Sequence, residues 1–76
     1  MTQLPQVTGE RLVRALLKLG FIEARRTGGH AIVRHASDPT RRASIPMHGS
    51  KAVRPGTLRA ILKGAGVTID DLNRPL

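Results

Sequence analysis

Apolar residues in the first third of the chain recur at the spacing of an α-helix. The apolar residues Leu12, Val13, Leu16 and Leu17 form one stripe of the helix, and basic residues lie on the solvent-facing side. Thr8 is suited to cap the N-terminus of this helix, and Gly20 stands where glycine commonly ends one. The pattern predicts an amphipathic helix from Gly9 to Leu19.

The next stretch has the shorter period of β-strands. Phe21 to Arg26 and His30 to His35 are predicted strands, and the short loop Thr27-Gly28-Gly29 between them suits a hairpin. A turn from Ala36 to Thr40 then leads into a third predicted strand, Arg42 to Pro46. Along the second strand, alternation predicts that Ala31 and Val33 share one face, while His30, Ile32 and Arg34 share the other.

Helical spacing returns after a polar loop from Met47 to Lys51. A second helix is predicted to begin near Arg54 or Pro55, because proline suits a first turn, and to end at Gly66. Its apolar face consists of Leu58, Ile61, Leu62 and Ala65. Thr68 to Asp71 resembles a capping box that opens one further turn.

The predicted element order is α-β-β-β-α with a short C-terminal turn. The simplest way to bury these apolar stripes is an α+β fold, in which two helices pack on one face of a three-stranded antiparallel sheet. A chain of 76 residues is one domain. We expect that domain to span residues 1–76, with a flexible N-terminus at 1–7 and a short turn and tail at 67–76.

Composition narrows the classes of protein that need to be considered. The chain has no cysteine, which excludes disulfides and thiolate metal sites. No run approaches the roughly 18 apolar residues of a membrane span, and residues 1–7 lack the basic start of a secretory signal. We therefore expect a cytoplasmic protein that does not associate with a membrane.

The charge balance points to a polyanionic partner. Thirteen Lys and Arg residues against five Asp and Glu residues give a net charge of +8. Nucleic acid is the commonest partner of such a surface, and an acidic protein is the other. Phe21 is the single aromatic residue, whereas domains that stack single-stranded bases need several rings. RNA or DNA should therefore be held mainly through phosphate contacts and shape.

His30 is the candidate catalytic residue. It follows two glycines, which allow a ligand to approach the backbone closely, and basic residues surround it. A neutral imidazole can take the proton from a ribose 2′-hydroxyl, while fixed cations stabilise the charge that develops on phosphorus. A histidine taken alone is more often a surface or hydrogen-bonding residue; it is the neighbourhood that favours RNA cleavage.

A second candidate element lies before the second helix. Lys51 and Arg54 flank its N-terminus, where free N–H groups can bind a phosphate, although a capped helix with solvated charges fits equally well. The residues expected to contact RNA are Arg25, Arg26, Gly28, Gly29, Arg34, Lys51 and Arg54. A three-histidine zinc site is disfavoured because the histidines have no helical i, i+4 pairing, and no buried acid supports serine–histidine catalysis by Ser44 or Ser50. No cofactor or metal is expected.

Several short motifs, taken in order, resemble the HicA family of toxin–antitoxin mRNA interferases. They are Gly20-Phe21, Gly28-Gly29-His30, Pro46-Met47-His48-Gly49, Pro55-Gly56-Thr57-Leu58 and Ile61-Leu62. The resemblance covers residues 8 to 66 and implies a double-stranded-RNA-binding-domain-like fold. It also implies metal-independent cleavage of mRNA by the histidine of the glycine-rich loop, and a cognate acidic HicB-type antitoxin. The family often has Gly-Ser-His where this chain has Gly-Gly-His.

Three functions stay open at this point. The first is an endoribonuclease that arrests translation, with His30 as general acid and base. The second is a non-catalytic module that binds double-stranded RNA through shape and phosphates. The third is a DNA reader that uses the second helix, which carries Arg59 and Lys63 but few residues able to discriminate bases. Residue chemistry and the family resemblance together favour the nuclease.

Overall fold

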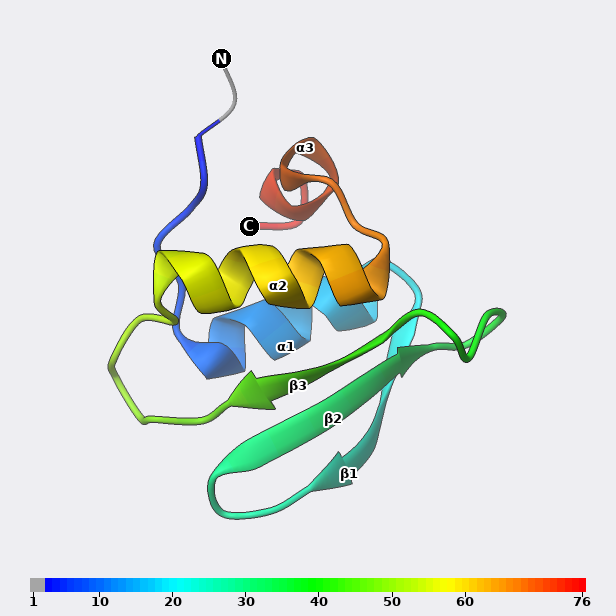
Figure 1. The fold of residues 1–76 in the computed structure, drawn as a ribbon, viewed down its shortest axis with the longest axis horizontal. Coiled ribbons are helices and arrows are strands. Elements are labelled where there is room, and N and C mark those ends of the chain that lie inside the picture. The colour runs from blue at the N-terminus through cyan, green and yellow to red at the C-terminus, as the bar shows by residue number, and fades with distance from the viewer. Residues whose placement is uncertain (1–2) are drawn as a thin grey trace.

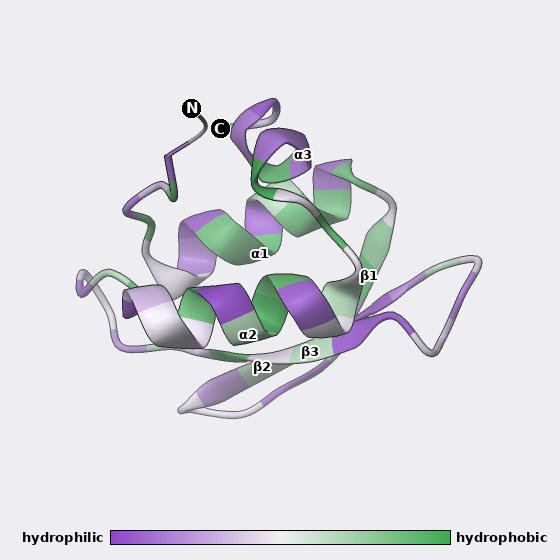
Figure 2. Cartoon of the chain, turned by 45° about the horizontal axis from the view of Figure 1, so that its top comes forward, coloured by the Kyte–Doolittle hydropathy of each residue, from purple (hydrophilic) through white to green (hydrophobic). Residues whose placement is uncertain are grey.

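The structure, a computed structural model, describes residues 3–76. Its elements are α1 (Gly9–Lys18), β1 (Phe21–Arg26), β2 (His30–His35), β3 (Arg42–Pro46), α2 (Pro55–Ala65) and α3 (Ile69–Asn73). The strands form one antiparallel sheet in the order β1-β2-β3. Helices α1 and α2 cover one face of the sheet, and α3 lies on their far side (Figures 1 and 2). The predicted α+β fold with its α-β-β-β-α order is confirmed.

Helix α1 begins where its capping residue predicts. The Thr8 hydroxyl accepts a hydrogen bond from the Arg11 backbone N–H at 3.2 Å, which satisfies one of the free donors of the first turn. Leu12 and Leu16 are fully buried in the hydrophobic core. Leu17 is 42% exposed, so the buried stripe is narrower than the sequence predicted.

Alternation along β2 separates the two faces of the sheet as predicted. Ala31 and Val33 are fully buried beneath the helices. His30, Ile32 and Arg34 occupy the alternate positions and face away from the helices, where the sheet is open (Figure 2). One face of the sheet therefore builds the core, and the other is free to carry function.

Strand β1 contains a bulge that changes which face its last residues occupy. The register shifts between Glu23 and Arg25, so that Arg25 pairs with Ile32 and Arg26 pairs with Ala31. An inserted residue reverses the alternation beyond it. Arg25 consequently shares the open face of the sheet, while Arg26 shares the helix-covered face.

Two glycines let the helices approach the backbone of β3 closely. A Cβ atom on Gly9 of α1 would collide with the Pro46 carbonyl oxygen, and one on Gly64 of α2 would lie 2.9 Å from the Arg42 carbonyl oxygen. The two ends of β3 are thus fixed against the two helices. The edge strand β3 is therefore packed against a helix at each of its ends.

The segments outside the main elements also pack on the core. Val7 is buried, and its carbonyl accepts a hydrogen bond from the Val53 N–H at 2.7 Å. Residues 1–2 of the expected flexible arm lie outside the described residues, and flexibility of the rest stays a prediction. The expected C-terminal turn is α3: its capping box between Thr68 and Asp71 is confirmed, and Leu72 is buried.

Arg41 ties the turn before β3 to the end of α2. Its guanidinium donates to the carbonyls of Ala65, at 2.8 Å, and Gly66, at 3.3 Å, and lies 5.5 Å from the centre of the Phe21 ring. Gly66 takes the left-handed conformation that ends the helix (φ 67°).

Across residues 3–76, every helix is too short or too polar to cross a bilayer.

Candidate functional site

His30 is exposed at the first position of β2, on the open face of the sheet. Its backbone is held by Thr27, whose N–H donates to the His30 carbonyl at 2.9 Å and whose hydroxyl accepts from the His30 N–H at 3.2 Å. These bonds close the hairpin loop and fix the start of β2. The imidazole is accessible, as an acid–base residue must be.

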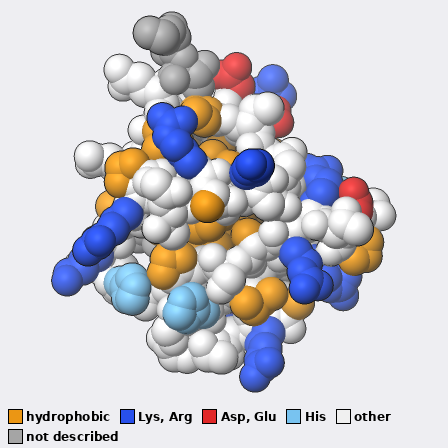
Figure 3. Space-filling view, in the orientation of Figure 1, with side chains coloured by type: hydrophobic (Ala, Val, Ile, Leu, Met, Phe, Trp, Pro, Cys, Tyr) orange, Lys and Arg blue, Asp and Glu red, His pale blue; other side chains and the backbone are white. Residues whose placement is uncertain are grey.

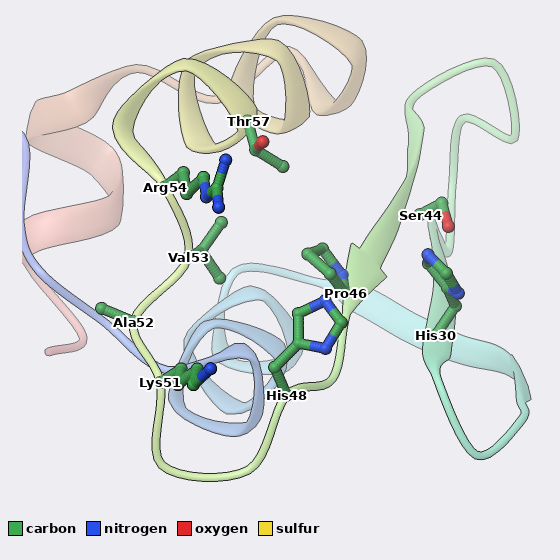
Figure 4. A pocket seen from close by; sticks show the side chains of 9 residues that line it. All are labelled: His30, Ser44, Pro46, His48, Lys51, Ala52, Val53, Arg54 and Thr57. Carbon is green, nitrogen blue, oxygen red and sulfur yellow. The ribbon is translucent and has the colours of Figure 1, made fainter.

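An open groove of about 810 Å³ lies beside this imidazole. Nine residues line it: His30, Ser44, Pro46, His48, Lys51, Ala52, Val53, Arg54 and Thr57. In Figure 4, His30 and Ser44 come from the strands, the residues from His48 to Val53 come from the loop after β3, and Thr57 comes from α2. Three separate parts of the chain therefore meet around the end of the edge strand β3.

The loop between β3 and α2 is fastened at both ends. The Met47 N–H donates to the Gly29 carbonyl at 2.9 Å, which extends the β2–β3 ladder beyond Pro46. At the other end Val53 is tied to Val7 and buried. Between these points the Lys51 N–H donates to the His48 carbonyl at 3.2 Å, and Gly49 adopts a positive φ of 62°. His48 and Lys51 therefore line the groove from a loop that is hydrogen-bonded at both ends.

The cationic wall of the groove is formed by Lys51, Arg54 and the first turn of α2. Arg54 is the N-cap of α2, Pro55 follows it, and the first turn contains no acidic residue. Free N–H groups and the positive end of the helix dipole favour an anion at such a terminus. None of the nine lining residues is acidic. The arrangement suits a phosphate held close to an imidazole.

Figure 3 shows this charge distribution on the surface. Two histidine side chains lie near one edge of the visible face, Lys and Arg side chains are spread across it, and the visible Asp and Glu side chains lie away from the histidines. A polyanion that approaches this face therefore meets little repulsion near the imidazoles.

Arg26 is placed differently from the other predicted RNA contacts. On the helix-covered face its guanidinium donates to Glu23 at 2.7 and 2.9 Å and to Glu10 at 2.8 Å. The hydrogen bond from Arg26 lowers the pKa of the Glu23 carboxyl, and both carboxylates raise the pKa of Arg26 above its ordinary value. This cluster joins α1 to the hairpin, and the structure does not bring Arg26 to the groove.

The remaining predicted contacts lie on the open face or in the hairpin loop. Arg25 and Arg34 share the face of His30: Ile32 lies between His30 and Arg34 along β2, and Arg25 pairs with Ile32 from β1. Gly28 and Gly29 have open space where a side chain would begin. None of these four residues lines the groove, so Lys51 and Arg54 are the predicted RNA contacts that share its lining with His30.

His35 belongs to the core side of the sheet. Its ring meets the Phe21 ring edge-on at 5.1 Å, and its Nδ1 accepts a hydrogen bond from the Ser37 N–H at 3.1 Å. These contacts give it a structural role. Within residues 3–76, no three His, Asp or Glu side chains come close enough together to hold a metal ion.

The structure adds three residues to the site that the sequence did not assign. Ser44 and Thr57 bring hydroxyls to the groove, and His48 brings a second imidazole. One signal for His48 is the strand pairing. Antiparallel pairing of the two predicted strands places Pro46 opposite His30, so the loop that follows Pro46 begins beside His30. The position of Thr57 depends on how α2 packs, which local pattern does not reveal.

The chain matches a known protein family. Residues 9–67 match the model of a family described as HicA toxin of bacterial toxin-antitoxin. That range covers more than half of the chain and includes β2, β3, the loop and α2. No curated protein matches the sequence.

Proposed function

The chain belongs to the HicA family of bacterial toxin–antitoxin toxins, and from this premise we propose that it is an endoribonuclease that cleaves mRNA without a metal ion. The observation that carries the proposal is the exposed His30 imidazole at a groove with Lys51 and Arg54. The substrate would be RNA in the cytoplasm, and the result would be arrest of translation.

The chemistry begins at the ribose beside the scissile phosphate. His30 takes the proton of the 2′-hydroxyl, and the 2′ oxygen then attacks phosphorus. Lys51, Arg54 and the first turn of α2 hold the phosphate and stabilise its developing negative charge. The 5′ oxygen needs a proton as it leaves. Arg25 and Arg34 on the open face would contact phosphates further along the strand.

The open form of the groove limits the rate that such a site can reach. One acid–base group contributes typically about 10²–10⁴-fold, and a groove open to water gives weaker electrostatic stabilisation than an enclosed site. A modest nuclease is nevertheless sufficient for a toxin that needs to cut each message once.

Membership of the family also implies an antitoxin partner. We propose a HicB-type antitoxin with an acidic surface that covers the groove. The net charge of +8 supports fast association with such a surface through complementary potentials.

The test is cleavage of a defined RNA by the purified chain in excess EDTA, with His30→Ala beside it. We expect the wild type to cleave and the variant to lose at least about 100-fold in rate with an unchanged melting temperature. Lys63→Ala, which removes an exposed cation of α2 outside the groove, is the matched control and should cleave normally. Undiminished cleavage by His30→Ala would refute the assignment.

The same experiment separates the second candidate function. A non-catalytic module for double-stranded RNA is supported by the high positive charge and the single aromatic residue. It predicts RNA affinity that falls steeply with salt, is unaffected by His30→Ala and is accompanied by no cleavage products.

A further inference from the structure

The groove contains a second imidazole, that of His48. It shares the groove with Lys51 and Arg54, which together with the first turn of α2 form the proposed phosphate-binding site, here called the phosphate seat. His30 pairs with Pro46 across the β2–β3 ladder, and His48 follows Pro46 by two positions. Both side chains line the groove, one from a strand and one from the loop after β3 (Figure 4). We propose that His48 is the general acid that protonates the leaving 5′ oxygen, an assignment that rests on the proposed nuclease function.

The hydrogen bonding of the three histidines sets His30 and His48 apart. Within residues 3–76, the rings of His30 and His48 have no hydrogen-bond partner or ion pair, whereas Nδ1 of His35 is occupied by Ser37. An imidazole needs at least one ring nitrogen that substrate and water can reach in order to accept and release a proton. The two histidines that are free for this exchange are the two at the groove.

The geometry of phosphodiester cleavage asks for two groups. In an in-line displacement the entering 2′ oxygen and the leaving 5′ oxygen lie on opposite sides of phosphorus, so one imidazole cannot contact both at the same time. Here Lys51 and Arg54 supply the phosphate seat, and a histidine is available from the sheet and another from the loop. The bond from the Lys51 N–H to the His48 carbonyl closes the turn that carries both residues, so that their backbones lie close together.

The proposed step balances as follows. His30, neutral, accepts the 2′-hydroxyl proton while the 2′ oxygen forms a bond to phosphorus. The bond from phosphorus to the 5′ oxygen breaks, its electron pair stays on that oxygen, and the oxygen takes a proton from the imidazolium of His48. The products are a 2′,3′-cyclic phosphate and a 5′-hydroxyl. Proton exchange with water then returns His30 to the neutral form and His48 to the protonated form.

A sulfur-substituted substrate tests this division of labour. Two RNAs of the same sequence are compared, one ordinary and one with sulfur in place of the bridging 5′ oxygen at the cleavage site, because a thiolate leaves without being protonated. On the ordinary RNA we expect His48→Ala to be about 10²–10⁴-fold slower than the wild type. On the sulfur RNA we expect it to approach the wild-type rate, while His30→Ala stays slow on both.

Controls keep loss of structure apart from loss of chemistry. Ser50→Ala changes the same exposed loop outside the groove and should match the wild type on both RNAs. His48→Gln preserves side-chain bulk and should show the same substrate dependence as His48→Ala. Melting temperatures of all variants are measured alongside.

Two results would overturn the assignment of His48: cleavage of the ordinary RNA at the wild-type rate by both His48 variants, or an equal defect on both RNAs. In either case the nuclease function and the role of His30 would stand. Wild-type protein that cleaves neither RNA would instead refute the nuclease function itself, and the role of His48 with it.

Discussion

His30 and Pro46 lie directly opposite each other in the β2–β3 ladder. This pairing sets the imidazole at the end of the sheet where β3 passes into the loop that carries His48 and Lys51. A shift of the register by one residue would turn His30 toward the helices, because neighbouring positions of a strand face opposite sides. The strand pairing therefore determines that the site exists at all.

Lys51 and Arg54 should contribute to RNA affinity rather than to the acid–base step. In a His30→Ala background, where we expect no cleavage, replacing either cation by Ala should weaken RNA binding and reduce the salt slope of log affinity by about 1. Binding titrations over a range of KCl concentrations measure this slope. Arg59→Ala, an exposed cation on α2 outside the groove, serves as the comparison, and an unchanged slope in the Lys51 and Arg54 variants would contradict the phosphate seat.

The Arg26 cluster should act on acid stability. Because the pKa of Glu23 is lowered in the folded state by Arg26, its contribution to stability is present above the unfolded carboxyl pKa and is lost as the pH falls through the lowered value. Arg26→Gln should move the Glu23 titration, followed by NMR, up toward its ordinary value. Arg25→Gln should leave that titration unchanged.

The same Arg26 variant also tests its predicted contact with RNA. Since its guanidinium is engaged with Glu10 and Glu23 away from the groove, we expect Arg26→Gln to cleave RNA near the wild-type rate. A large loss of cleavage with an unchanged melting temperature would show that Arg26 leaves its carboxylates to bind the substrate.

Replacement of Gly9 and Gly56 by alanine should change the free energy of unfolding in opposite directions, although both glycines lie in the first turn of a helix. Gly9→Ala places a methyl group against the Pro46 carbonyl, so we expect a loss of about 1–3 kcal/mol in the free energy of unfolding. Gly56, in the first turn of α2, has open space around it, and Gly56→Ala should gain about 0.4–1 kcal/mol. Chemical denaturation measures both, and equal effects would argue against the close packing of α1 on β3.

The half-buried Arg41 should contribute more to stability than its exposed neighbour Arg42. Arg41→Ala removes two hydrogen bonds to the end of α2 and the contact with the Phe21 ring, and should cost about 1–3 kcal/mol. Its neighbour Arg42 is exposed and faces Arg34 across the ladder. Arg42→Ala should therefore leave the stability unchanged or slightly raised, as thermal denaturation can show.

Much of the fold follows from local pattern. The bounds predicted for the three strands coincide with those observed, because the Gly28-Gly29 loop and the 36–40 turn interrupt the chain at the strand ends. The bulge in β1 carries no such signal. Without it, alternation from the buried Phe21 would place Arg25 inside and Arg26 outside, the reverse of the arrangement observed.

The candidate site was less predictable than the fold. The exposure of His30 and its face of the sheet follow from the parity of β2, and both are as predicted. The rest of the groove depends on contacts between distant segments, above all the bond between Val53 and Val7 that anchors the loop. No property of residues 47–53 taken alone indicates where that anchor lies.

The groove has a volume of about 810 Å³, within the range of roughly 300–1,000 Å³ typical of sites that hold drug-sized molecules. Its lining combines both imidazoles and both cations with the apolar side chains of Pro46 and Val53. If the proposed function holds, a compact dianion with a flat apolar body that occupies this groove should inhibit cleavage without covering the other predicted RNA contacts.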